Sequence, residues 1–206
     1  MKKVLTLFFI LWCSTAWAVE PINLARGFNP YVAGSTGGAA ASCSEATNEV
    51  GLRDEGTDTR TLAPDIAVCY EATADCTGTL GTGYAYHNNT TAANVKTCVF
   101  LKGTNPDTNG TNTKVGCSSS IAGGTSTGWK TSAMDGGSVT GTASYWVCIF
   151  VESGGSDFEI KAGDGTYTFW YLTGSGYYAS PPANLYNVSF SSSAASAYRN
   201  FYVTIK

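Results

Sequence analysis

The stretch SYWVCIFV, residues 144–151, decides the fold class of this chain. In an extended strand, successive side chains point to opposite faces of the sheet. One face of this strand would carry Tyr145, Val147, Ile149 and Val151, and the other Trp146, Cys148 and Phe150. Because both faces are apolar, we predict a strand at the centre of a sheet that is covered on both sides.

Further stretches with a two-residue period follow from residue 66 onward, separated by turns rich in Gly, Asn, Ser and Asp. No stretch of about ten residues carries apolar side chains at helical spacing. The pattern predicts an all-β domain of roughly nine or ten strands. Short connections favour an antiparallel β-sandwich, jelly-roll-like in form and tied by disulfides. The expected strands lie at residues 65–70, 80–87, 95–101, 114–121, 144–151, 158–162, 166–172, 185–190 and 198–206.

Residues 1–18 have the three parts of an export signal. Lys2 and Lys3 precede the short apolar stretch 4–12, and small residues at 16 and 18 place cleavage before Val19. The apolar stretch is shorter than the about 20 residues that span a membrane. We therefore expect a secreted protein, extracellular or periplasmic, without membrane insertion. Residues 19–64 are expected to be partly loop and to belong to one domain with the sandwich core, residues 65–206.

The charge balance argues against a nucleic-acid partner. The chain has 12 basic and 15 acidic residues, and loss of the signal with its two lysines leaves 10 − 15 = −5. Phosphate contacts by Lys and Arg dominate nucleic-acid affinity, and this sequence has no basic cluster. The 43% hydrophobic content in turn argues against a disordered chain.

Six cysteines remain after signal removal, and an even number in an exported chain predicts disulfides. Cys69 and Cys76 flank a short polar loop. Cys98 and Cys117 flank a turn rich in Gly and Asn, and would lie opposite each other if the strands pair about its midpoint. The expected pairs are Cys69–Cys76, Cys98–Cys117 and Cys43–Cys148, although spacing alone leaves other pairings open. A zinc site is disfavoured because no C-x-x-C pair occurs.

The order of elements between residues 95 and 151 carries a resemblance. The strand VKTCVFL (95–101) is followed by a turn, a short strand VGCSSS (115–120), Gly128-Trp129-Lys130, and the Tyr145-Trp146 that opens the central strand. This order resembles uncharacterised jelly-roll-like β-sandwich modules of bacterial extracellular proteins and phage virion proteins. The resemblance implies a fold and a location, and binding or surface display more than catalysis.

The sequence offers few residues for catalysis. The single histidine, His87, ends an expected strand before a turn; it could serve as a general base, but an exposed polar residue is the simpler interpretation. Four acids close in sequence could supply the carboxylate pair of a glycosidase, although solvated loop charges explain them more simply. These acids are Glu152, Asp157, Glu159 and Asp164. No nucleophile elbow of the form G-x-S-x-G occurs, so we do not expect an enzyme.

One loop has the spacing of a calcium site. Asn105, Asp107 and Asn109 offer oxygen atoms at alternate positions before Gly110, as calcium loops do. The loop has one carboxylate and lacks the distant Glu that completes such sites. The acidic segment 53–60 is a second candidate. We expect no cofactor, and calcium stays the one open alternative.

Aromatic residues between positions 167 and 178 (YTFWYLTGSGYY) suggest carbohydrate binding. The apolar C–H faces of sugar rings stack on aromatic rings, while neighbouring polar groups bond the hydroxyls. The candidate ligand-binding residues are Trp170, Tyr177, Tyr178 and Tyr186. The competing interpretation is that these rings fill the core, where we also expect Trp129 and Trp146.

These observations predict an exported, non-catalytic binding module whose ligand is a glycan or another cell-surface molecule. The alternative is a structural or assembly subunit of a virion, filament or cell envelope, in which the aromatic residues would form a protein interface. A long unpaired edge strand would favour that alternative. A secreted glycoside hydrolase is the third interpretation.

Overall fold

The computed structural model describes residues 43, 48–53, 58–88, 93–103, 112–124, 126–154, 156–173, 176–185, 190–198 and 200–206, all within one compact unit, residues 39–206. In these ranges the chain forms twelve strands and no helix, so no helix there could cross a membrane. The all-β prediction is confirmed. The strands are β1 (Glu49–Arg53), β2 (Asp58–Leu62), β3 (Ile66–Thr73), β4 (Gly78–His87), β5 (Val95–Leu101), β6 (Lys114–Cys117), β7 (Gly128–Ala133), β8 (Ser138–Val139), β9 (Ser144–Val151), β10 (Phe158–Thr173), β11 (Phe190–Tyr198) and β12 (Asn200–Ile205).

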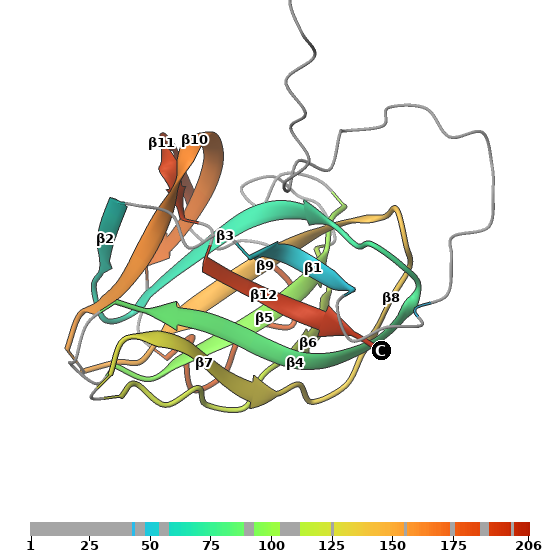
Figure 1. Cartoon of the computed structure of the whole chain (residues 1–206), viewed down its shortest axis with the longest axis horizontal. Coiled ribbons are helices and arrows are strands. Elements are labelled where there is room, and N and C mark those ends of the chain that lie inside the picture. The colour runs from blue at the N-terminus through green and yellow to red at the C-terminus, as the bar shows by residue number, and fades with distance from the viewer. Residues whose placement is uncertain are drawn as a thin grey trace, which may run out of the picture. The chain divides into compact units, whose positions relative to one another are not determined.

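The strands form two sheets, and every pairing is antiparallel (Figure 1). The five-stranded sheet has the order β1-β12-β4-β7, with β8 on β4. The seven-stranded sheet has the order β11-β10-β3-β9-β5-β6, with β2 on β10. The antiparallel sandwich is confirmed, whereas its jelly-roll-like form stays a prediction. Strands β1 and β2, from the segment 19–64, add one strand to each sheet.

Apolar side chains from the two sheets meet between them in an inter-sheet core. The seven-stranded sheet contributes alternate residues of its central strands, such as Val68, Val147 and Ile149. The five-stranded sheet contributes Phe201 and Val203 of β12, which are 0% exposed. Burial of these residues follows the two-residue period that the sequence shows for β9 and the chain end.

A second cluster covers the opposite face of the seven-stranded sheet, and we call it the outer core. It consists of Ala67, Cys69, Cys98, Phe100, Cys117, Trp146, Cys148, Phe150, Trp170, Leu172 and Leu185. Residues 176–185, here called the strap, lie over it, with Tyr177 and Tyr178 packed against the cluster. Backbone hydrogen bonds fix the end of the strap, from Lys114 N to Ala183 O (2.8 Å) and from Leu185 N to Asn112 O (2.9 Å). The prediction that β9 is covered on both faces is therefore confirmed.

One of the three expected disulfides is confirmed, and two are wrong. Cys98–Cys117 forms as expected. Cys69 pairs with Cys148, and Cys43 with Cys76, in place of Cys69–Cys76 and Cys43–Cys148. The reason is the strand order, because β3 lies beside β9 with Cys69 directly opposite Cys148. Cys76 lies beyond the end of β3, where Cys43 N donates a hydrogen bond to the neighbouring Thr77 O (3.2 Å).

The strand boundaries differ from expectation where the sequence is polar or small. Residues 158–173 form one strand, β10, in place of two, because a register shift between Gly163 and Thr166 preserves its pairing with β11. Strands β7 (GWKTSA) and β11 (FSSSAASAY) were not predicted, since neither shows an apolar alternation. Of the expected strand 185–190, Leu185 precedes β11 and residues 186–189 lie outside the described part of the chain.

The hydroxyl of Tyr70 links the two sheets across the inter-sheet core. Tyr70 extends from β3 of the seven-stranded sheet and is 3% exposed. Its oxygen accepts a hydrogen bond from Leu52 N of β1 (2.8 Å) and donates one to Phe201 O of β12. Two backbone groups of the five-stranded sheet therefore depend on one side chain of the other sheet.

We predict that Tyr70→Phe lowers the free energy of unfolding by about 1–3 kcal/mol, because Leu52 N and Phe201 O lose a buried partner. Urea denaturation followed by tryptophan fluorescence measures the change. The matched control is Tyr177→Phe on the strap, whose effect should stay within about 0.5 kcal/mol. Equal stability of Tyr70→Phe and the wild type would contradict the role given to this hydroxyl.

Candidate functional site

The structure buries Trp170, one of the residues predicted to bind a ligand. Its side chain is 6% exposed and packs edge-to-face on Trp146, with ring centroids 6.2 Å apart. A ring covered to this extent offers no free face to a sugar. Trp146, at 2% exposure, is in the core as predicted. Tyr186 lies outside the described residues.

Tyr177 and Tyr178 are partly buried against the outer core and help to fasten the strap. The Tyr178 hydroxyl donates a hydrogen bond to Ser120 Oγ (2.7 Å). The ammonium group of Lys96 lies 4.9 Å from the Tyr178 ring centroid and 3.5 Å from Ala179 O. These contacts give Tyr178 a structural role, while both tyrosines stay partly exposed.

His87 is buried, which corrects the expectation of an exposed turn residue. It is 0% exposed, and its ring lies 4.3 Å from the Phe158 ring, centroid to centroid, at 84°. Strand β4 continues through His87, which pairs with Gly128 of β7. Its position in the two-residue period is that of buried Ala85, so the side chain points into the sandwich.

Glu152, the first candidate acid, is engaged in holding two loops together. Its Oε2 accepts a hydrogen bond from Asn94 Nδ2 (2.7 Å), and its backbone N donates to Asn94 O (2.9 Å). Asp157 is exposed and Glu159 partly buried, while the side chain of Asp164 is not among those described. The described contacts therefore assign Glu152 a structural task.

The calcium loop with Asn105, Asp107 and Asn109 lies outside the described residues. Within the described ranges, no three His, Cys, Asp or Glu side chains gather as metal ligands would.

The outer surface of the five-stranded sheet carries an aromatic face that the sequence analysis did not single out. It consists of Tyr84 and Tyr86 of β4, Trp129 of β7 and Tyr202 of β12, on three neighbouring strands (Figure 1). In β4 these tyrosines alternate with buried Ala85 and His87, and in β12 Tyr202 lies between buried Phe201 and Val203. The rings therefore point away from the inter-sheet core.

The four rings are in mutual contact across the strands. Tyr84 lies directly opposite Tyr202, and their rings stack with centroids 4.5 Å apart at 7°. Trp129 lies edge-on to Tyr86 at 5.4 Å and to Tyr202 at 5.1 Å. Tyr202 is 2% exposed beneath its neighbours, whereas Tyr84, Tyr86 and Trp129 are partly exposed. The result is a continuous aromatic surface that is open to solvent on one side.

Gly51 of β1 makes this packing possible at the edge of the face. It lies opposite Tyr202 and has a φ of +120°, a conformation that favours glycine. A Cβ at this position would come within 2.8 Å of both Cα and Cβ of Tyr202. Any side chain here would therefore displace the ring on which the face is built.

Charged groups from β1 border the aromatic face. The guanidinium carbon of Arg53 lies 4.7 Å from the Tyr202 ring centroid, and Arg53 Nη2 lies 3.6 Å from Glu49 Oε2. Burial raises the pKa of Tyr202 to about 12, against the opposing effect of Arg53. Burial likewise raises the pKa of Glu49 to about 7; nearby Asp75 adds to this rise, and Arg53 opposes it.

This arrangement presents groups that suit a flat, partly apolar ligand. The partly exposed rings offer stacking surface, Arg53 offers donors, and Glu49 offers an acceptor at the border.

The prediction that Trp129 lies in the core is wrong, because its side chain is partly exposed. The sequence signal for the aromatic face was the alternation of Tyr84 and Tyr86 with small or polar residues. It did not identify the face, because Trp129 lies on β7, a strand that was not predicted.

Comparison of the chain with protein-family models, with curated proteins and with solved structures finds no match.

The ionisation of Glu49 predicts a pH dependence of stability. The folded-state pKa of about 7 lies above the ordinary value of 4.5, so between these values the folded state holds a proton that the unfolded state has lost. The free energy of unfolding should therefore fall as the pH rises from 4.5 to about 7, and then level off with respect to this group. Glu49→Gln should lose this decline, as measured by denaturation across the pH range. Below pH 4.5 the two proteins should be equally stable, and parallel profiles throughout would contradict the assignment.

Proposed function

We propose that the chain is an exported, non-catalytic β-sandwich binding module and that a glycan stacks on the aromatic face. The single observation behind this proposal is the contiguous set of partly exposed rings on β4 and β7, set over Tyr202. The three disulfides support export, because such bonds persist mainly in oxidising compartments. The predicted signal, residues 1–18, supports the same location.

A glycan fits the chemistry of this face better than a purely apolar ligand. A sugar ring presents C–H groups on its faces and hydroxyls around its rim. The aromatic rings can stack on the C–H faces of the sugar. The Arg53–Glu49 pair at the border offers both a donor and an acceptor for its hydroxyl groups. The pair is held at the border by the contact of Arg53 with Tyr202.

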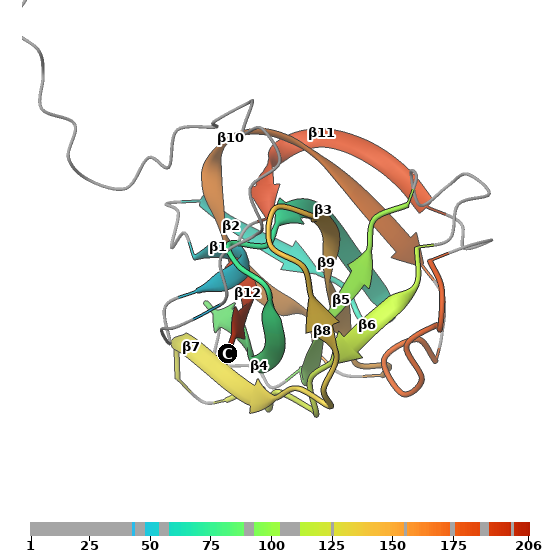
Figure 2. The same cartoon turned by 90° about the vertical axis from the view of Figure 1, so that its right-hand side faces the viewer.

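A specific observation also favours the alternative, a structural or assembly subunit. Strand β11 is the last strand of the seven-stranded sheet and, in the described part of the chain, pairs with β10 alone (Figure 2). It is nine residues long and contains no charged residue and no proline. Natural edge strands usually carry charges or prolines that prevent pairing with other chains. A strand without them can add to the sheet edge of a second molecule.

Trp129→Ala tests the glycan proposal. We expect it to weaken glycan binding by at least about tenfold, because a stacking ring contributes about 1.4 kcal/mol or more. A glycan array with the wild-type protein identifies the ligand, and calorimetry with the best hit measures the change. The matched control is Tyr178→Ala on the strap, which should bind the hit as the wild type does.

Two results would contradict the glycan proposal. The first is the absence of any glycan bound by the wild-type protein. The second is a loss of binding in the strap variant with full binding in Trp129→Ala, which would return the site to the strap.

Ala195→Lys in the middle of β11 tests the alternative. If the chain assembles through this edge, the wild type should form larger species as its concentration rises, and the lysine should abolish them. Light scattering over a range of concentrations measures both. The matched control is Thr131→Lys on β7, an edge strand that already carries Lys130. A wild type that stays monomeric at all concentrations would argue against assembly through β11.

A further inference from the structure

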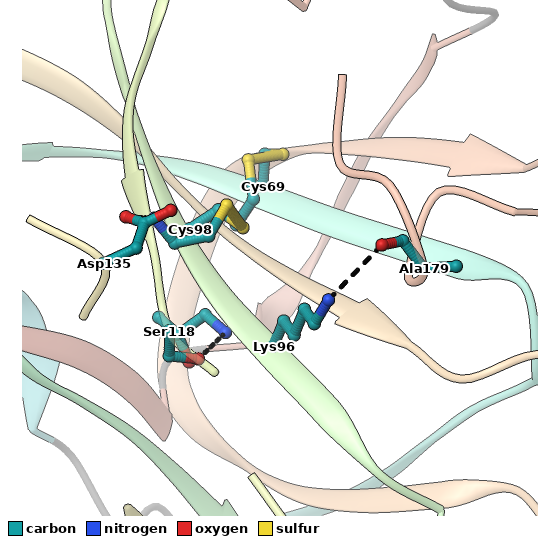
Figure 3. The surroundings of a disulfide bond; sticks show 9 residues. Cys69, Lys96, Cys98, Ser118, Asp135 and Ala179 are labelled. Carbon is teal, nitrogen blue, oxygen red and sulfur yellow. Dashed lines mark hydrogen bonds between the residues drawn. A yellow bond between two sulfur atoms is a disulfide. The ribbon is translucent and has the colours of Figure 1, made fainter. Parts of the chain in front are cut away.

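Four of the six disulfide cysteines form one row across four neighbouring strands. Cys69 of β3 lies opposite Cys148 of β9, Cys148 opposite Cys98 of β5, and Cys98 opposite Cys117 of β6. Residues directly opposite each other in antiparallel strands point to the same face. All four side chains belong to the outer core, and Figure 3 shows the disulfide of Cys98 next to that of Cys69. Each inner cysteine thus has a cysteine on both sides.

The outer pairs of the row occupy the closely spaced positions of the sheet. In antiparallel sheets, closely spaced pairs without mutual hydrogen bonds alternate with hydrogen-bonded pairs about 5.5 Å apart, Cα to Cα. Cys98 and Cys117 are of the first kind, with Cα atoms 4.0 Å apart. Cys117 N donates to Asp135 Oδ1 and Asp135 N donates to Cys117 O, both at 2.8 Å, so the Cys117 backbone bonds away from Cys98.

Cys69 and Cys148 are equally close, at 4.0 Å between Cα atoms. Since the pairs alternate along the row, Cys148 and Cys98 form the hydrogen-bonded pair between them. Its Cα spacing of about 5.5 Å falls within the usual range for a disulfide, and its Cβ atoms, about 5.5 Å apart, must approach each other by about 1 Å for the bond to form. The row therefore admits two bonding patterns, the present outer pairs or a single bond in the middle.

The row is buried, and least deeply at one end. Cys117 is 6% exposed, whereas Cys69, Cys98 and Cys148 are 0% exposed. Strand β6, which carries Cys117, has four residues and is the last strand of its sheet, so local opening around this strand can expose the Cys98–Cys117 bond without unfolding the centre. The part of the strap near Tyr178 is held by side-chain contacts with Lys96 and Ser120, and its far end by the backbone hydrogen bonds described above.

We propose that the cysteine row is a thiol–disulfide exchange site that a small external dithiol enters at Cys117. A dithiol thiolate attacks Cys117 Sγ, and Cys98 leaves as a thiolate. Cys98 then attacks Cys148 Sγ to form Cys98–Cys148, and Cys69 leaves and takes up a proton. The second thiol of the reagent closes a cyclic disulfide, which releases Cys117 as a thiol. The reagent is oxidised by two electrons, and the protein retains one bridge in the row.

The exchanged protein has a different set of covalent ties. The bonds between β3 and β9 and between β5 and β6 are lost, and a bond between β5 and β9 is gained. Cys43–Cys76 is not in the row and takes no part in the exchange. The new thiols lie at the two ends, with Cys69 opposite Trp170 of β10 and Cys117 on the sheet edge.

Limited reduction of the wild-type protein with dithiothreitol tests the proposal. The reaction is stopped with acid, free thiols are alkylated with N-ethylmaleimide, and peptides are mapped by mass spectrometry. In the species with two labelled cysteines and an intact Cys43–Cys76 bond, we expect the labels on Cys69 and Cys117 and a Cys98–Cys148 bridge. Labels on Cys98 and Cys117 with Cys69–Cys148 intact would overturn the proposal, since they would show reduction without exchange.

Two double variants test the geometry without a reductant. Cys69→Ser with Cys117→Ser leaves the inner cysteines, and we expect them to form a disulfide during expression in an oxidising compartment. Cys117→Ser with Cys148→Ser leaves Cys69 and Cys98, which are separated by β9 and should remain free thiols. Two free thiols in the first variant would overturn the proposal. Should either variant fail to fold, the mapping of the wild-type protein still decides.

Discussion

The rest of the structure depends on the burial of β9 on both faces. A strand whose side chains are all apolar from Tyr145 to Val151 needs cover on two sides, and the molecule supplies an inter-sheet core on one side and an outer core on the other. The outer core in turn requires a lid of its own, which the strap provides with Tyr177 and Tyr178. The same strand places Cys148 between two other cysteines, so the disulfide pattern also follows from its central position.

This double cover explains why the proposed binding surface lies on the five-stranded sheet. Trp146 and Trp170 are buried in the outer core, and the strap tyrosines Tyr177 and Tyr178 are partly buried against it. In the described part of the chain, the five-stranded sheet packs against a core cluster on its inner side only. The rings on its outer side are therefore not covered by another layer of described residues. Their mutual stacking and the contact between Arg53 and Tyr202 hold them in place, which leaves part of Tyr84, Tyr86 and Trp129 open to solvent.

The sequence predicted what depends on neighbouring residues and missed what depends on strand order. The two faces of β9 and the bridge between Cys98 and Cys117 follow from alternation and from a single hairpin. The Cys69–Cys148 bridge joins residues 79 positions apart, and no local pattern indicates that β3 lies beside β9. The burial of His87 could have been predicted, because it shares the alternation of Ala85. The partial exposure of Trp129 could not, since β7 lacks an apolar pattern and sits at a sheet edge.

The cysteine row and the aromatic face lie on opposite sides of the sandwich, with the inter-sheet core between them. Exchange within the row changes covalent ties in the seven-stranded sheet alone, because all four cysteines are on its strands. The disulfide nearest the aromatic face is Cys43–Cys76. Next to Cys76 in the chain, Asp75 N donates a hydrogen bond to Glu49 O of β1. A change of redox state can therefore loosen one sheet while the rings of the other keep their positions, so the two proposed sites can operate independently.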